Sequence, residues 1–72
     1  MSTHRIILVS PVADGWAVLC SGLEPLVFRS GARAEAQAKK LAACLAALGR
    51  AVQVRILDRG WNLVGTQVYA AA

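Results

Sequence analysis

Charged residues are scarce in this chain of 72 residues, where they make up 17% of the composition. The acidic residues are Asp14, Glu24, Glu35 and Asp58, and no two of them are close in the sequence. This spacing argues against a pair of carboxylates for general acid–base catalysis. The six glycines are isolated from one another, so the chain has no glycine-rich phosphate loop. We therefore predict that the protein is not an enzyme.

Metal-ligating residues are equally few. The chain has two cysteines, Cys20 and Cys44, without a Cys-x-x-Cys spacing, and a single histidine, His4. A structural zinc site needs four ligands at short, regular spacings, and a disulfide framework usually needs more cysteines. We expect no metal and no cofactor, and we interpret both cysteines as reduced, small apolar residues of a cytoplasmic protein.

Long hydrophobic runs are also missing. The longest run, residues 41–48, is much shorter than the roughly 20 residues that cross a bilayer. Residues 6–9 are too few for the core of a signal peptide. We expect a soluble protein without a membrane partner, consisting of one domain over residues 1–72. A domain of this size buries only about 60% of its unfolded surface, so a partner subunit is plausible for a chain that is 57% hydrophobic.

Two Gly-Trp steps stand out among the residues that are present. Gly15-Trp16 and Gly60-Trp61 each lie between apolar segments of strand character. Each pattern is typical of a β-hairpin with a three-residue loop, in which the glycine takes the left-handed conformation. The predicted strands are residues 5–10, 16–20, 26–29, 51–57 and 61–64, the last extending toward 69.

An alanine-rich segment between the two hairpins predicts a helix over residues 31–48. Ser30 is a favourable N-cap, and Gly49 fits the position just after the helix. One apolar stripe follows the helical period. It consists of Ala34, Ala38, Leu41, Leu45 and Leu48. The sequence therefore predicts an α+β fold of order β-β-β-α-β-β, an antiparallel sheet with one helix packed on one face.

The loop length decides which side chains the helix covers, because a shift of one residue moves a strand's side chains to the other face. Three-residue loops pair Leu57 with Trp61 and Val12 with Trp16. Ile7, Val9, Ala17 and Leu19 then lie under the helix. The uncovered face carries the interface candidates Leu8, Trp16, Val18, Leu57, Trp61 and Leu63. A two-residue turn at Arg59-Gly60 would instead bury Trp61 under the helix, and both tryptophans would be core residues of a monomer.

An uncovered apolar face of this size is rarely left in water. We predict a small non-enzymatic interaction module that forms a homodimer through this face. The alternative is a small basic nucleic-acid-binding protein that uses the same face, because the net charge is +4 and arginines accompany the tryptophans. A helix start between arginines also suits an anion. The nucleic-acid and anion candidates are Arg5, Arg29, Ser30, Arg33, Arg55 and Arg59.

The order of these motifs resembles a group of short bacterial proteins of unknown function. The motifs are Gly15-Trp16-Ala17-Val18, Phe28, Ala34-Glu35-Ala36, Leu41-Ala42, Val52-Gln53-Val54 and Asp58-Arg59-Gly60. They extend from about Val9 to Leu63, and each is short. The resemblance implies a compact α+β domain, and it assigns no activity and no functional residue.

Overall fold

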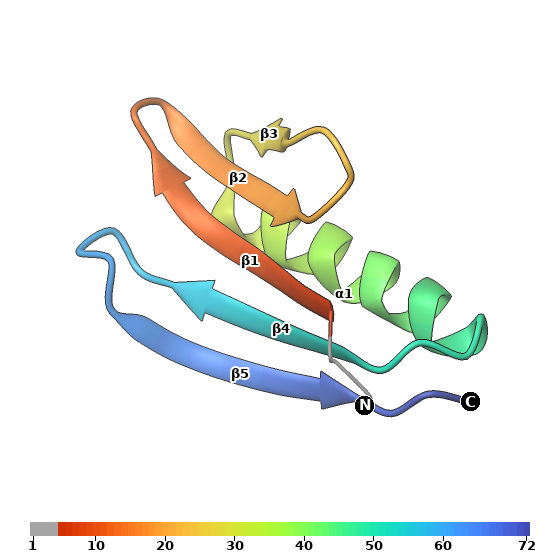
Figure 1. Ribbon diagram of the computed structural model, residues 1–72. Helices are drawn as coiled ribbons and strands as arrows, with labels where there is room; N and C mark the ends of the chain where they lie inside the picture. Colours follow the sequence, from red (N-terminus) through yellow and green to blue (C-terminus); the bar gives the residue numbers. More distant parts are fainter. Residues whose placement is uncertain (1–4) are drawn as a thin grey trace.

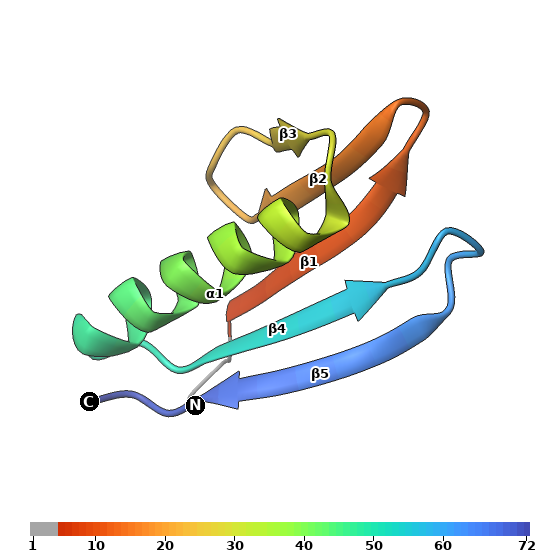
Figure 2. The ribbon, with the colours of Figure 1, turned by 180° about the vertical axis from the view of Figure 1, so that it is seen from behind.

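A computed structural model describes residues 5–72 (Figure 1). His4 lies outside the described residues. The elements are β1 (Arg5–Val12), β2 (Gly15–Cys20), β3 (Leu26–Phe28), α1 (Gly31–Ala47), β4 (Val52–Leu57) and β5 (Leu63–Tyr69). The strands form one sheet of order β3-β2-β1-β4-β5, and α1 packs on one face of it (Figures 1 and 2). The predicted α+β class and order of elements are confirmed.

The sheet is mixed, so the prediction of a fully antiparallel sheet is wrong. β1 pairs with β2, β2 with β3 and β4 with β5 in antiparallel fashion, but β1 and β4 are parallel neighbours. The reason is the helix. α1 carries the chain back from the end of β3 to the start of β4, so β4 runs in the same direction as β3 and β1.

The ends of α1 follow the predicted capping residues. The Ser30 side chain accepts a hydrogen bond from the Arg33 amide at 3.4 Å. At the other end Gly49 has φ 89°, and its amide donates to Ala46 O at 3.0 Å. The Arg50 amide donates to Leu45 O at 3.0 Å, which completes a Schellman motif.

The helix face that meets the sheet differs from the predicted stripe. Its buried residues are all alanines spaced four apart: Ala34, Ala38, Ala42 and Ala46. Leu41 and Leu45 pack beside this row and are partly buried, whereas Leu48 follows the helix and is 72% exposed. An alanine row lets the helix lie close to the sheet, and it leaves the leucines at the border of the contact.

The core is correspondingly small. Its largest fully buried apolar side chains are Ile7, Val9, Val18, Val52 and Val54, all from β1, β2 and β4. They face α1. No buried side-chain nitrogen or oxygen among the described residues lacks a hydrogen-bond partner.

The β1–β2 turn is one residue shorter than predicted. Val12 pairs with Gly15, so the loop is Ala13-Asp14, and Pro11 pairs with Trp16. Gly15 does not have a positive φ. Glycine is required there because a Cβ atom would overlap the carbonyl oxygen of Phe28 on β3.

The shorter turn reverses the predicted faces of β2. Trp16, Val18 and Cys20 pack against the core under α1, whereas Ala17 and Leu19 lie on the other face. The prediction that Trp16 and Val18 belong to the uncovered face is therefore wrong.

The β4–β5 loop is longer than either predicted form. Leu57 pairs with Leu63, and the loop is the five residues 58–62. Trp61, not the glycine, has the positive φ, 65°. Asp58 holds the loop, because its Oδ1 accepts hydrogen bonds from the amides of Gly60 at 2.8 Å and Asn62 at 3.0 Å. The predicted pairing of Leu57 with Trp61 is wrong.

Candidate functional site

No helix or strand of the described residues 5–72 packs on the sheet face opposite α1, and we call it the open face, although Ser10 and Ala17 on it are only 1% and 3% exposed. The strand register aligns its residues in rows that cross the sheet. They are Ile6, Leu8, Ser10 and Val12 of β1, Ala17 and Leu19 of β2, Val27 of β3, Gln53, Arg55 and Leu57 of β4, and Leu63, Thr66 and Val68 of β5. This face looks toward the viewer in Figure 1, and α1 lies behind it.

Most of the open face is apolar. Ile6, Val27, Leu63 and Val68 are between 41% and 66% exposed. Arg55 is the one charged residue of the face, and its Nε donates a hydrogen bond to the neighbouring Gln53 Oε1 at 3.0 Å. Large apolar side chains with this exposure are rare in a contiguous patch unless the patch binds something.

Three of the six interface candidates lie on the open face. Leu8, Leu57 and Leu63 are placed there by the register. Trp16 and Val18 belong to the opposite, helix-covered face. Trp61 is 63% exposed, but it belongs to the loop and not to a strand. The additional members of the face, such as Leu19, follow from the two-residue turn.

The β1–β2 turn and the β4–β5 loop lie at the same end of the sheet, which we call the loop end. There, Trp16 of β2 contacts the β4–β5 loop and the start of α1. The guanidinium carbon of Arg59 lies 4.9 Å from the centroid of the Trp16 ring. Arg59 Nη1 also donates to Val12 O at 2.8 Å, so Arg59 links the two hairpins. A Cβ atom on Gly31 would lie 3.1 Å from the indole. The helix therefore starts directly beside the ring.

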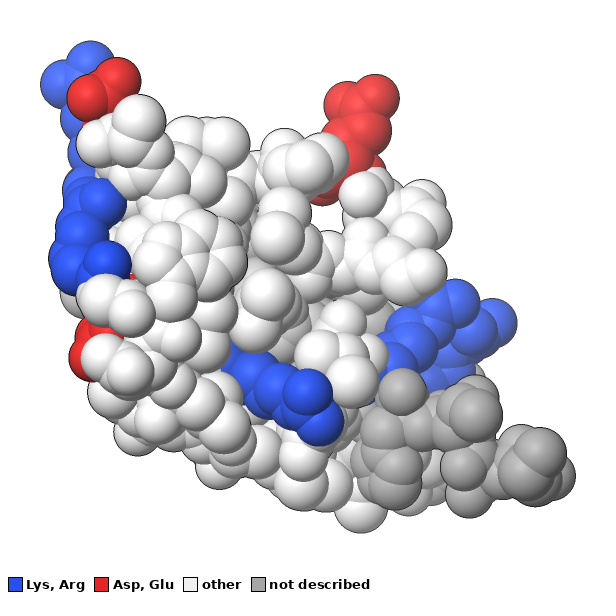
Figure 3. Space-filling model, turned by 60° about the vertical axis from the view of Figure 1, so that its left-hand side comes forward, with Lys and Arg blue, Asp and Glu red and all other residues white. Residues whose placement is uncertain are grey.

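The structure does not gather the basic candidates on one face. Arg5 lies at the start of β1 and donates to Ser21 O at 3.3 Å, whereas Arg55 lies on the open face. Arg29, Ser30 and Arg33 flank the helix start. Figure 3 brings the loop end forward, and its Lys and Arg side chains form separate groups around a broad uncharged surface.

The β4–β5 loop carries the one carboxyl group with a clearly shifted pKa among the described residues. The pKa of Asp58 is lowered from its ordinary value of 3.8, mainly because its carboxylate accepts the backbone hydrogen bond of Asn62. Hydrogen bonds from the Gly60 amide and the Asn62 side chain act in the same direction. These bonds hold the loop in one conformation, with Trp61 exposed.

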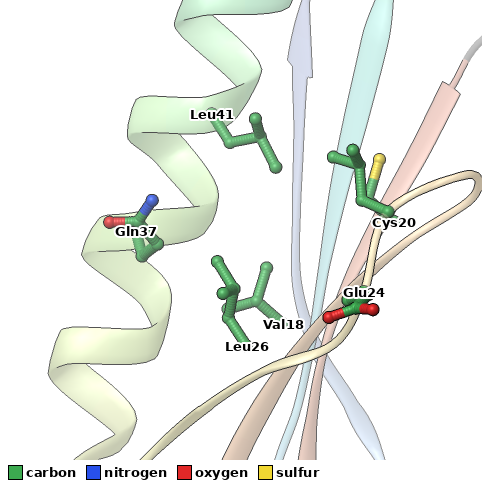
Figure 4. Close-up of a pocket in the computed structure, with 7 residues that line it drawn as sticks. Val18, Cys20, Glu24, Leu26, Gln37 and Leu41 are labelled. Atoms are coloured by element: carbon green, nitrogen blue, oxygen red, sulfur yellow. The ribbon is translucent and has the colours of Figure 1, made fainter.

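An apolar pocket of about 290 Å³ lies between α1 and the β2–β3 turn. In Figure 4, the Leu41 side chain points from the helix toward the side chains of the sheet, and Gln37 lies on the helix beside it. Its lining residues are Val18, Cys20, Leu23, Glu24, Leu26, Gln37 and Leu41. The sequence did not predict this pocket, and a signal for it was the apolar Leu23 within the turn of residues 21–25.

The described residues contain no group of three or more His, Cys, Asp or Glu side chains placed to hold a metal ion. Cys20 is buried and Cys44 is exposed, and neither forms a disulfide. The interpretation of both cysteines as small apolar residues therefore fits the buried Cys20, and the exposure of Cys44 argues against it there. Over residues 5–72, no helix combines the length and the apolar character that crossing a bilayer requires.

Comparisons with protein-family models, with curated proteins and with solved structures found no match to this chain. The resemblance to short bacterial proteins stays a prediction. The open face is consequently interpreted from its own residues.

Proposed function

We propose that this protein is a non-enzymatic interaction module that forms a homodimer through the open face. The observation that carries the proposal is the apolar character of a sheet face on which no element of residues 5–72 packs. Two copies packed sheet on sheet would cover Leu8, Leu57 and Leu63 together with their exposed neighbours Ile6 and Val68. Sheets packed face to face are a common arrangement of β proteins.

The small core supports this assignment. The helix contributes alanines to the buried contact, so its burial supplies less apolar area than a leucine stripe would. At roughly 25 cal/mol per Å² of apolar surface, a second sheet would add the stabilisation that the helix lacks. Small domains commonly gain stability by association in this way.

The test is the mass of the protein in solution, measured by light scattering during size-exclusion chromatography. Leu8→Lys places a cation at the centre of the open face, beside Arg55 in the strand register. Desolvating two adjacent cations is costly, so we expect this variant to lose the face-to-face contact. Ile6→Lys, at a position that is 41% exposed, is the second variant because the folded monomer tolerates it more readily.

Ala36→Lys is the matched control. It adds the same charge on an exposed position of α1, away from the sheet, and lysine is a good helix former. We expect the control to keep the mass of the wild type. A wild-type protein that stays monomeric at millimolar concentration would contradict the proposal, as would folded Leu8→Lys and Ile6→Lys variants with unchanged mass.

Nucleic-acid binding is the second candidate function, and one observation favours it. Arg59 lies over Trp16, and the ring lies against the helix start that Arg29 and Arg33 flank. Neither tryptophan lies on the open face, so this candidate is confined to the loop end. It requires binding that weakens steeply with salt and that Arg59→Ala reduces. Absence of binding to single-stranded RNA or DNA at low salt would exclude it.

We further propose that the protein works in the cytoplasm, as a thiol protein. Free cysteines suit a reducing compartment, and the exposed Cys44 would be open to oxidation elsewhere. Fractionation of the source cells, followed by alkylation of the fresh extract, tests this. Protein recovered outside the cytoplasm, or with an oxidised Cys44, would contradict it.

A further inference from the structure

The two edges of the sheet differ in how they are protected. β3 is an edge of three residues, preceded directly by Pro25. β5 is an edge of seven residues without a proline or a charged side chain. Natural proteins usually shorten, charge or cover such an edge, because its unpaired N–H and C=O groups accept a further strand. β5 has none of these protections along most of its length.

No other part of the described chain covers the β5 edge. The strand forms the outer border of the sheet in Figures 1 and 2. The residues after it turn toward the helix, because the Ala72 amide donates to Ala46 O at 2.9 Å. Leu63, Val64 and Val68 on this strand are 56%, 62% and 58% exposed. The main-chain edge and the side chains along it are therefore both accessible.

We propose that β5 pairs edge to edge with β5 of a second copy, in antiparallel orientation, to form one continuous sheet of ten strands. This contact uses the main chain of the edge and is separate from the open-face contact proposed above. The two are compatible, and together they would join four copies.

The composition of β5 favours pairing with β5 of a second copy. The protein has a net charge of +4, which opposes self-association where cations meet, but β5 brings no charges together. A two-fold axis at Thr66 would bring the whole strand into the contact and centre it on Gly65, Thr66 and Gln67, which pair regularly with β4. It would place Thr66 opposite its own copy, Val64 opposite Val68, and Gly65 opposite Gln67. Thr–Thr and Val–Val pairs across antiparallel strands are favourable.

The irregularity of β5 does not prevent this pairing. The bulge lies at Val64, because Ile56 pairs with Gly65 whereas Leu57 pairs with Leu63, and residues 65–69 pair regularly with β4. Thr66 and Val68 also belong to the open face. The joined sheet would therefore continue the apolar surface of one copy into the next.

The edge contact is tested in a Leu8→Lys protein, in which the open-face contact is expected to be lost. Ile6→Lys replaces Leu8→Lys if it folds better. We expect either variant to be a dimer by light scattering, because the edge contact still joins two copies. Adding Thr66→Lys puts like charges directly opposite each other at the axis, and we expect a monomer. Mixing that protein with the matching Thr66→Glu protein should restore a dimer, because the charges are then opposite.

Amide hydrogen exchange gives a second readout. In the Leu8→Lys background, we expect the amides of Leu63–Tyr69 that face the free edge to exchange at least tenfold more slowly at high protein concentration than at low concentration, whereas the amides bonded to β4 serve as the internal reference. A folded Leu8→Lys monomer with concentration-independent exchange would overturn the edge proposal and leave the open-face proposal intact. Suppose instead that the wild type and Leu8→Lys are both dimers, and that adding Thr66→Lys gives a monomer. This result would overturn the open-face proposal alone.

Discussion

Gly15-Trp16 and Gly60-Trp61 are the same two residues between apolar strands, yet their surroundings differ. Trp16 is the second residue of β2, packs against the core and lies beside the helix start. Trp61 lies in a five-residue loop, 63% exposed and with positive φ. The glycines differ too, since Gly15 avoids the Phe28 carbonyl, whereas Gly60 donates its amide to Asp58.

The difference lies in what surrounds each turn. Next to the first turn, β3 approaches so closely that only glycine fits, which fixes Gly15 inside the strand pair. In the second loop, the Asp58 carboxylate binds two amides and extends the loop to Asn62. A short sequence repeat therefore need not give a structural repeat, because neighbours outside the repeat set the register.

The largest expected contrast is between the two tryptophans. Trp16→Ala removes a ring packed on the core and should lower the free energy of unfolding by about 3 kcal/mol. Trp61→Ala removes a mostly exposed ring and should change it by less than about 0.5 kcal/mol. Urea unfolding followed by circular dichroism, at one protein concentration, measures both. Equal losses in the two variants would show that the tryptophans are equivalent.

Substitutions of the two glycines should differ less in their effect on the free energy of unfolding than those of the two tryptophans. Gly15→Ala forces a Cβ into the Phe28 carbonyl, a main-chain atom that cannot move aside, and should destabilise by about 2 kcal/mol. In Gly60→Ala, the new Cβ lies 3.0 Å from Asn62 Nδ2, at the end of an exposed side chain that can shift, and its 3.4 Å distance from Asp58 Oδ1 is an ordinary contact. We expect this variant to stay within about 0.5 kcal/mol of the wild type. Thermal unfolding of the pair checks the order.

The contact that Arg59 makes between the two hairpins should contribute less to the free energy of unfolding than the residues above. Arg59→Ala removes the cation over the Trp16 ring and the hydrogen bond to Val12 O. We expect a loss of about 1 kcal/mol, against no measurable loss for Arg33→Ala. In a Trp16→Ala background the effect of Arg59→Ala should fall by at least half, since paired residues are not additive. Full additivity in this double-mutant cycle would contradict the contact.

The smallest effect is a pH dependence from Asp58. Its pKa is lower in the folded protein than its ordinary value of 3.8. The ionised carboxylate thus stabilises the fold above pH 3.8, and this contribution is lost as the pH falls through the lower folded pKa. Asp58→Asn keeps an acceptor oxygen but cannot titrate. Between pH 7 and pH 3 the wild type should lose more stability than Asp58→Asn, and identical losses would contradict this role.

The sequence predicts those parts of the fold that depend on local residues. Ser30 and Gly49 mark the helix ends because each satisfies backbone groups within one turn. Leu8 is placed on the open face because it alternates with Ile7 and Val9, whatever the loop length. Such local rules cover the helix, the strands and part of the site.

The register and the strand order depend on distant contacts. The faces of Trp16 and Val18 depend on the approach of β3 to Gly15, which no pattern within the hairpin encodes. The parallel pairing of β1 with β4 depends on the path of the helix across the sheet. The alanine row replaces the leucine stripe because close helix–sheet packing favours the smallest side chains. Leu41 and Leu45 are displaced to the border for the same reason.

The parallel pairing of β1 with β4 also has a consequence for how the chain folds. The β1–β2 hairpin forms from neighbouring residues, but the centre of the sheet closes only when Val52–Leu57 reaches β1. This pairing joins residues far apart in the sequence, such as Arg5 and Val52, and contacts of that separation go with slower folding than in helical domains of the same size. Until closure, the apolar strand β1 keeps a free edge. Unpaired strand edges of this kind are prone to misassociation during folding.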